Sequence, residues 1–123
     1  DRYKIKCVLY RKDRIKKVTS KIKKIIIKKN MGWCDDPRSK AYNKIIQLPS
    51  NFSHEKLYRK SNIYDIILVL NYNMNPIIKN KGSAIFIHLT ENYKPTLGCI
   101  AIQKNDLLVL LKLIDTKTKI RIS

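Results

Sequence analysis

The sequence predicts a mainly β fold with one principal helix, an α+β arrangement, in a single domain spanning residues 1–123. Several short runs of isoleucine, leucine and valine suit strands, and one amphipathic stretch near the C-terminus suits a helix. The composition, 44% hydrophobic and 29% charged, is typical of a globular domain with one core. No apolar run approaches the length needed to cross a bilayer, so no transmembrane segment is expected.

The first predicted strand is Tyr3–Tyr10. In it Ile5, Cys7 and Leu9 fall on one face and Lys4 and Lys6 on the other, which approximates the period-two pattern of a half-buried strand. We therefore expect these three side chains to share one face and to point into the core.

The signals are weaker between residues 11 and 63. Arg11–Lys24 is a basic run with little periodicity, which we expect to be a long exposed excursion. Ile25–Ile27 is β-branched and favours a strand, and residues 30–32 predict a turn. We expect a loop over Trp33–Lys40 and one or two helical turns over residues 53–57, with Ser53 as the cap.

The C-terminal half has clearer elements. Tyr64–Tyr72 is rich in isoleucine, leucine and valine and predicts a strand that is buried on both faces. Further strands are expected at Ala84–Leu89, Cys99–Ile102 and Lys119–Ile122. The principal helix is expected over Lys104–Ile114, because four leucines between residues 107 and 111 give it an apolar face.

The formal charge of +18 suggests attraction to an anionic surface. Of the 27 basic residues, however, 21 are lysine and only six are arginine, the residue that base reading and bidentate phosphate contacts favour. The composition therefore favours solvated basic faces over specific nucleic-acid recognition. Attraction to nucleic acid or to an anionic cell envelope is the alternative.

The three cysteines do not form a CxxC pair, which argues against a zinc site. Cys7 is expected in the core. Cys34 is followed by two aspartates, whose charges disfavour a thiolate. Cys99 has no acidic residue close to it in the sequence, so it is the candidate nucleophile; the alternative is a small core residue.

A cysteine nucleophile needs a base and oxyanion donors, because a thiol with a pKa near 8.5 is mostly protonated at neutral pH. Gly98 would let the backbone turn sharply and present its N–H groups beside Cys99. His88 ends an apolar strand, and the following loop could bring it to Cys99; the alternative is a core histidine. His54 lies in a polar stretch and is expected at the surface.

These residues resemble a known family. SAIFIH at 83–88, PTLGCIAI at 95–102 and DLL at 106–108 are similar to the core of the L,D-transpeptidase (YkuD-like) catalytic domain. Residues 9–14, GWCDDP at 32–37, and the pairs at 64–65 and 72–73 resemble a proteobacterial branch of that family. The likeness spans nearly the whole chain.

The resemblance implies a β-sandwich-like fold that here lacks its first strands, as in an N-terminally truncated fragment. It implies a cysteine acyltransferase of the bacterial periplasm or cell envelope, with peptidoglycan stem peptides as partners and no metal or organic cofactor. Cys99 would attack a diaminopimelate carbonyl, release D-alanine and pass the acyl group to an amine of a neighbouring stem. His88 would be the base, and backbone N–H groups around Gly98 would stabilise the oxyanion.

The chain departs from the family at the motif itself. Most members have Ser-His-Gly-Cys where this chain has Thr96-Leu97-Gly98-Cys99, so the second histidine is absent. An arginine that is usual two positions after the cysteine is Ala101 here.

Six residues are candidates for binding the stem peptide, because aromatic side chains and an arginine suit a peptide ending in a carboxylate. They are Thr96, Trp33, Tyr72, Asn73, Tyr10 and Arg11. The alternative for the aromatic residues, Asn73 and Arg11 is that they pack loops onto the sandwich.

At the level of the whole chain, the alternatives are an L,D-carboxypeptidase or endopeptidase using the same site, a non-catalytic basic binding module, and a catalytically silent family member.

Overall fold

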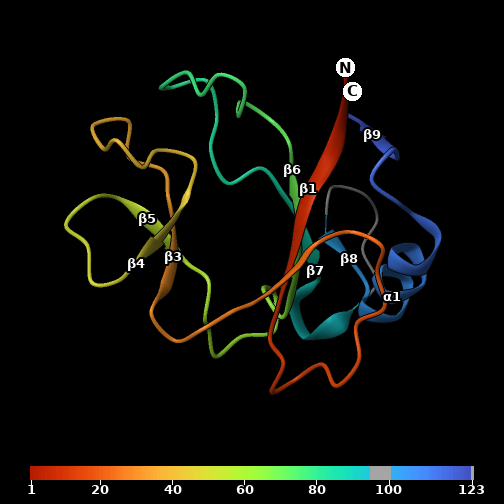
Figure 1. Cartoon of the computed structure of the whole chain (residues 1–123). Helices are drawn as coiled ribbons and strands as arrows, with labels where there is room; N and C mark the ends of the chain where they lie inside the picture. The colour runs from red at the N-terminus through yellow and green to blue at the C-terminus, as the bar shows by residue number, and fades with distance from the viewer. Residues whose placement is uncertain (95–100, 123) are drawn as a thin grey trace.

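The computed structural model describes residues 1–94 and 101–122 and has two β-sheets and one α-helix, as expected for a mainly β chain (Figure 1). The residues of the motif at 95–100, among them Thr96, Gly98 and Cys99, lie outside the described residues.

The larger sheet has the strand order β2-β1-β6-β7-β8. In addition, β9 pairs with the first residues of β1, Arg2–Lys4. The smaller sheet has the order β4-β3-β5. The pairs β1–β2 and β7–β8 are parallel, and every other pairing is antiparallel. The strands are β1 (Arg2–Tyr10), β2 (Lys24–Ile26), β3 (Met31–Cys34), β4 (Ile45–Gln47), β5 (His54–Lys56), β6 (Ile66–Leu70), β7 (Phe86–Leu89), β8 (Ala101–Ile102) and β9 (Lys119–Arg121), and the helices are the 3-10 helix η1 (Glu91–Tyr93) and α1 (Lys104–Leu113).

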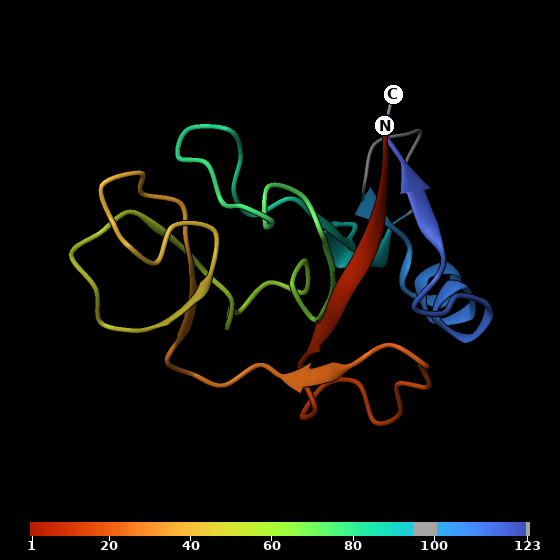
Figure 2. The same ribbon diagram turned by 45° about the horizontal axis from the view of Figure 1, so that its top comes forward.

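The larger sheet lies between α1 on one side and the smaller sheet on the other (Figures 1 and 2). Two hydrophobic cores follow from this layering. The first core lies between the sheet and α1 and includes Leu68, Leu107 and Leu111. The second core faces the smaller sheet and includes Trp33 and Phe86. All five residues of β6 are buried, which confirms the strand predicted to be buried on both faces.

The prediction that Ile5, Cys7 and Leu9 share one face is wrong. Ile5 packs in the first core, whereas Cys7 and Leu9 pack in the second core. The pairing of β1 with β6 shifts register between Ile5 and Cys7, and an irregularity of this kind turns the following side chains to the other face.

The prediction that Arg11–Lys24 is an exposed excursion is also wrong in part. Ile15, Val18 and Ile22 are buried in the first core, while the lysines between them point to solvent. Figure 2 shows this segment running below the end of β1 toward α1. Apolar residues three and four positions apart thus anchor a segment that has no regular secondary structure.

The loop predicted from Trp33 and the helical turns predicted at residues 53–57 are both wrong, at least in part, because strands of the smaller sheet pair there. Residues 54–56 form β5 instead of helical turns, because they pair with β3, and Ser53 Oγ donates to Asp35 Oδ1 at 2.6 Å instead of capping a helix. The loop expected from Trp33 onward begins only after Cys34, and Gly32 lies inside β3 instead of in a turn. A Cβ at Gly32 would lie 2.9 Å from Leu48 Cδ2 and 3.3 Å from the backbone oxygen of Glu55 in β5, so a larger residue here would require the Leu48 side chain to move.

The predicted C-terminal helix and closing strand are confirmed with small shifts at their ends. Of the strand predicted at Cys99–Ile102, Ala101 and Ile102 form β8, and Cys99 and Ile100 lie outside the described residues. The helix expected over Lys104–Ile114 is α1, ending at Leu113, and the closing strand is β9. β7 begins at Phe86, two residues later than predicted, because Ala84 has a positive φ of 57° that is incompatible with a regular strand.

Gly82 precedes β7 and has a φ of +127°, and a Cβ there would lie 2.7 Å from Tyr72 Cε1. We expect Gly82→Ala to lower the free energy of unfolding by about 1–3 kcal/mol, because it adds both backbone strain and a clash with an aromatic ring. Urea denaturation of wild type, Gly82→Ala and the exposed neighbour Lys81→Ala measures this. In a Tyr72→Leu background the cost should shrink without vanishing; an unchanged cost would mean that the clash is absent.

Candidate active site

His88 lies in a row of residues that crosses four strands of the larger sheet. It pairs with Ile67 of β6 on one side and with Ala101 of β8 on the other. Ile67 in turn pairs with Leu9 of β1. Because Ile67 and Leu9 belong to the second core, His88 lies on the face of the sheet that looks toward the smaller sheet.

The imidazole ring of His88 is half-buried and has a defined hydrogen bond. Its Nδ1 lies 2.9 Å from the carbonyl oxygen of Leu89. A carbonyl can only accept, so this contact assigns the proton to Nδ1, and the lone pair of the neutral ring is then on Nε2. A histidine in this tautomer can take a proton from a thiol.

Aromatic packing holds this ring in place. The ring of Tyr64 meets the ring of His88 edge to face, with a centroid distance of 5.6 Å. Tyr64 also packs edge to face on Phe86 at 5.9 Å, and Phe86 packs on Trp33 of β3 at 5.2 Å. The smaller sheet therefore reaches His88 through a chain of three aromatic side chains.

Charged residues of β5 and the following turn cover the outer side of Tyr64. The guanidinium carbon of Arg59 lies 4.3 Å from the Tyr64 ring centroid, and Arg59 Nη2 is 2.6 Å from Glu55 Oε2. Burial raises the pKa of Tyr64, and the nearby carboxylate of Glu55 raises it further. The phenol of Tyr64 thus stays neutral and acts as a packing surface for His88.

A buried carboxylate ties together the segments around the site. Asp65 is 1% exposed, and its two oxygens accept hydrogen bonds from Tyr93 Oη at 2.5 Å and from Arg14 Nη1 at 2.9 Å. Lys104 Nζ, at the start of α1, lies 5.1 Å from the Tyr93 ring centroid. Tyr93 precedes residues 95–100 and Lys104 follows them, so this cluster joins the chain on both sides of that segment to the residue just before β6.

The structure does not bring Arg11 to His88. Arg11 is buried; its guanidinium makes a bidentate ion pair with Asp13 at 2.7 and 2.8 Å and donates to the carbonyl of Arg59 at 2.8 Å. It also stacks on the ring of Tyr58 at 3.5 Å. The hydrogen bonds from Arg11 lower the pKa of Asp13 to about 2. These contacts favour the alternative in which Arg11 packs loops together.

Tyr72 and Asn73 lie in the loop after β6. Asn73 donates from Nδ2 to the carbonyls of Ile78 and Gly82 at 2.7 and 2.9 Å and accepts the N–H of Ile78 at 2.8 Å, so its amide closes its own loop. Tyr72 is half-buried, and its ring lies 5.0 Å from that of Tyr3.

Two further candidates lie apart from His88 or are enclosed. Tyr10 pairs with Ile66 and packs in the first core, on the face of the sheet opposite to His88. Trp33 is 3% exposed and donates from Nε1 to Asn43 Oδ1 at 3.2 Å. Trp33 is thus linked to His88 only through Phe86 and Tyr64.

The two described cysteines are poor nucleophiles. Cys7 is 4% exposed, and burial raises the pKa of its thiol in spite of two nearby lysines. Cys34 is fully buried in β3. His54 lies on β5, with its Nδ1 2.7 Å from the carbonyl of Phe52, and is half-buried.

Within residues 1–94 and 101–122, no cluster of three or more histidine, cysteine, aspartate or glutamate side chains could hold a metal ion. In the same residues, no helix has the length and apolar character to span a membrane.

Sequence reasoning missed Tyr64, Tyr93 and Asn43 as determinants of the site. Asn43 is buried and has a φ of 60°; its Nδ2 donates to the carbonyls of Tyr72 and Asn73, and its Oδ1 accepts from Trp33. No local pattern marks this asparagine. Tyr64 could have been noted, because it is a polar-tipped aromatic at the start of the most buried strand.

The fold and the site define a two-sheet, mainly β domain with a histidine held by aromatic packing in a central strand. A family model for the L,D-transpeptidase catalytic domain (YkuD) matches residues 4–122. The chain therefore belongs to the YkuD family, whose members are generally cysteine-dependent L,D-transpeptidases that act on the peptidoglycan of the cell wall. Comparison with curated proteins and with solved structures gives no match.

The hydrogen bond from Tyr93 to Asp65 gives a prediction that depends on pH. Burial and then Asp65 raise the pKa of Tyr93 to about 12, above the value of about 10 in an unfolded chain. The bond should therefore stabilise the fold fully below pH 10 and be lost as the pH rises through 12. Relative to Tyr93→Phe, we expect wild type to be more stable by about 1–2 kcal/mol at neutral pH, with the difference closing between pH 10 and 12.

Urea denaturation of both proteins across this pH range measures the difference. Tyr3→Phe is the matched control, because the hydroxyl of Tyr3 makes no hydrogen bond within the described residues. A difference for Tyr93→Phe that is flat to pH 12 would contradict the prediction.

Proposed function

We propose that this chain is a peptidoglycan L,D-transpeptidase in which Cys99 is the nucleophile and His88 the base. The observation that supports this most directly is the pairing of His88 with Ala101 across β7 and β8. Ala101 follows Cys99 by two positions, and two residues of chain span at most about 7 Å. The covalent chain thus limits how far the thiol can lie from the histidine row.

In the proposed reaction, Nε2 of His88 takes the proton of the Cys99 thiol, and the sulfur forms a bond to the carbonyl carbon of diaminopimelate in a stem peptide. Backbone N–H groups at Gly98 and Cys99 donate to the resulting oxyanion. The C–N bond to D-alanine then breaks, and the imidazolium returns its proton to the leaving amine. An amine of a neighbouring stem attacks the thioester and restores the thiol.

The tautomer of His88 supports this role. The Leu89 carbonyl holds the Nδ1 proton, and edge-to-face packing on Tyr64 fixes the ring. Because neither contact uses Nε2, this nitrogen has its lone pair for proton transfer. The absence of the family's second histidine, replaced by Leu97, leaves His88 as the base in this proposal.

Two finer features of the proposal rest on the sequence resemblance: membership of a proteobacterial branch, and a location in the periplasm or cell envelope of a bacterium. Contact of Thr96, Tyr72 and Trp33 with the stem peptide is a further part of the proposal, and for the two aromatic residues it rests on the suitability of such side chains for binding a peptide. The internal contacts of Arg11 and Asn73, and the position of Tyr10 on the opposite face, favour packing for those three.

Cysteine labelling tests the nucleophile. We expect a carbapenem or iodoacetamide to modify Cys99 in preference to Cys7 and Cys34, because the latter two are buried. Intact-protein mass spectrometry should show a single adduct on wild type and none on Cys99→Ser. His88→Gln should slow the labelling by about 10²–10⁴-fold at neutral pH, because the thiol loses its base.

His54→Gln is the matched control and should label at the wild-type rate, since His54 lies on the smaller sheet. Undiminished labelling of Cys99→Ser would refute the assignment of the nucleophile. Equal rates for His88→Gln and His54→Gln would remove His88 as the base.

Product analysis separates transfer from hydrolysis. Incubation with tetrapeptide muropeptides should give cross-linked dimers and free D-alanine, because the thioester is passed to an amine. An L,D-carboxypeptidase would give tripeptides and D-alanine without dimers, and an endopeptidase would cleave existing cross-links. A basic binding module or a silent family member would release no D-alanine in excess of the Cys99→Ser control.

A further inference from the structure

A pocket of about 320 Å³ lies between the β1–β2 edge of the larger sheet and the smaller sheet. Its size is at the lower end of the range of small-molecule sites, about 300–1,000 Å³. It is lined by Lys6, Cys7, Lys23, Ile25, Trp33, Asn43, Lys44, Ile45, Met74 and Ile77. The chemical steps proposed for Cys99 and His88 use none of these residues, and only Trp33 among them is also a candidate for contact with the stem peptide.

The walls of the pocket are mainly apolar. Cys7 and Trp33 form its inner part and belong to the second core, and Ile25 and Met74 pack against that core from the side. The exposed side chain of Ile45 lies at the edge. An apolar chain or ring that bound here would be transferred from water to an apolar surface that is continuous with the second core, which is favourable.

The rim is positively charged. Lys6, Lys23 and Lys44 come from three different segments, all three are exposed, and no acidic residue is among those that line the pocket. Lys6 and Lys23 both lower the pKa of the Cys7 thiol, against the effect of burial, so their positive potential reaches into the pocket. The four ion pairs of the described chain all use arginine, which leaves these lysines available for a ligand.

The remaining polar side chain of the pocket is already satisfied. Asn43 uses both its amide nitrogen and its oxygen for bonds to Trp33, Ala84 and the carbonyls of Tyr72 and Asn73. Polar recognition of a ligand therefore falls to the lysines, which select for a negative charge and not for a neutral donor or acceptor.

The pocket is separate from the histidine site. None of its lining residues belongs to β6, β7 or β8, the strands that carry Ile67, His88 and Ala101. Trp33 links the two regions, because it lines the pocket and also packs on Phe86.

We propose that this pocket binds a small amphipathic anion, a carboxylate joined to a short alkyl or aromatic body. The apolar part lies against Cys7, Trp33 and Met74, and the carboxylate lies at the rim between Lys6, Lys23 and Lys44. The proposal does not depend on the reaction at Cys99, and its test has no readout of activity.

The test compares octanoate with 1-octanol, which has the same chain but no charge. Trp33 is the only tryptophan, so its fluorescence reports on the pocket directly, and calorimetry gives an independent affinity. We expect octanoate to bind at least tenfold more tightly than 1-octanol at low ionic strength, and the difference to narrow as salt is added.

The matched variants remove equal charge at different places. Lys6→Gln, Lys23→Gln and Lys44→Gln combined should abolish the preference for octanoate. Lys112→Gln, Lys117→Gln and Lys119→Gln combined should keep it, because these exposed lysines lie on or after α1. All six are surface positions, so both proteins should fold.

Two results would overturn the proposal. One is equal binding of octanoate and 1-octanol by wild type. The other is an equal loss of octanoate affinity in the two triple variants, which would mean that only the net charge of the chain matters.

Discussion

The burial of β6 on both faces is the constraint on which the structure depends. Its five residues are apolar and inaccessible, and they divide the interior into the first core, under α1, and the second core, toward the smaller sheet. A strand with both faces covered cannot slip by one residue without exchanging its two cores. The register of β1 and β7 against this strand is therefore fixed, and with it the position of His88.

The smaller sheet contributes to the site through a chain of aromatic side chains. Its strand β3 supplies Trp33, which begins the aromatic chain through Phe86 and Tyr64 to the imidazole. Edge-to-face contacts of this kind add about 0.5–1.5 kcal/mol each to the burial of the rings. Asn43 and Ser83 strengthen the same junction by hydrogen bonds between the sheets' connecting segments. The histidine is thus held by packing that originates in both sheets.

Sequence patterns predicted the elements that have a clear apolar run or hydrophobic period of their own. β6, α1 and β9 follow from hydrophobicity and period alone, and the family resemblance was confirmed at the level of the YkuD domain. β5 could not be predicted, because His54–Lys56 has no strand pattern and is extended only through its pairing with β3. The irregularity in β1 was equally invisible, since alternation alone places Ile5 and Cys7 on one face. For the site, the sequence singled out His88 but not Tyr64 or Tyr93, whose contacts come from residues far along the chain.

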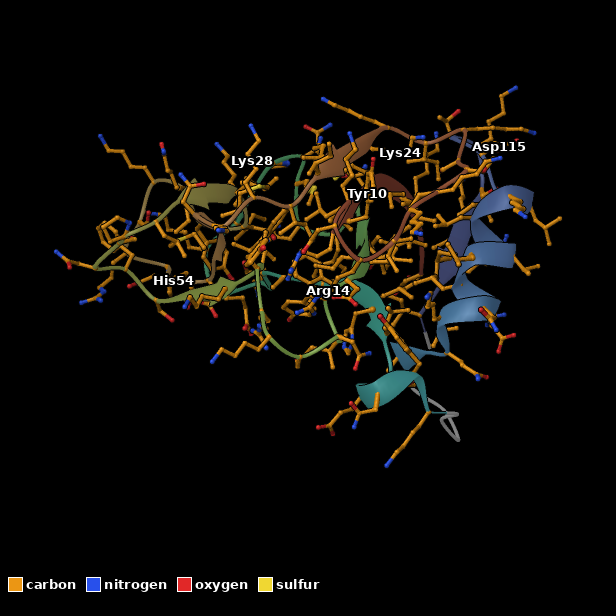
Figure 3. The ribbon with its side chains drawn as sticks, turned by 90° about the horizontal axis from the view of Figure 1, so that it is seen from below. Tyr10, Arg14, Lys24, Lys28, His54 and Asp115 are labelled. Carbon is orange, nitrogen blue, oxygen red and sulfur yellow. The ribbon has the colours of Figure 1, made fainter. Side chains whose placement is uncertain are left out.

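Arginine residues form the ion pairs of the described chain, whereas most lysine residues are exposed to solvent. Every ion pair in the described residues joins an arginine to a carboxylate, and two of the carboxylates involved are almost inaccessible. Most lysines, in contrast, are exposed, and many outward-pointing side chains, including Lys28, carry nitrogen at their tips (Figure 3). Counterions screen exposed charges far more than buried ones. Changes in ionic strength should consequently affect the ion pairs of the two buried carboxylates little, while altering steeply the rate at which the protein meets negatively charged polymers.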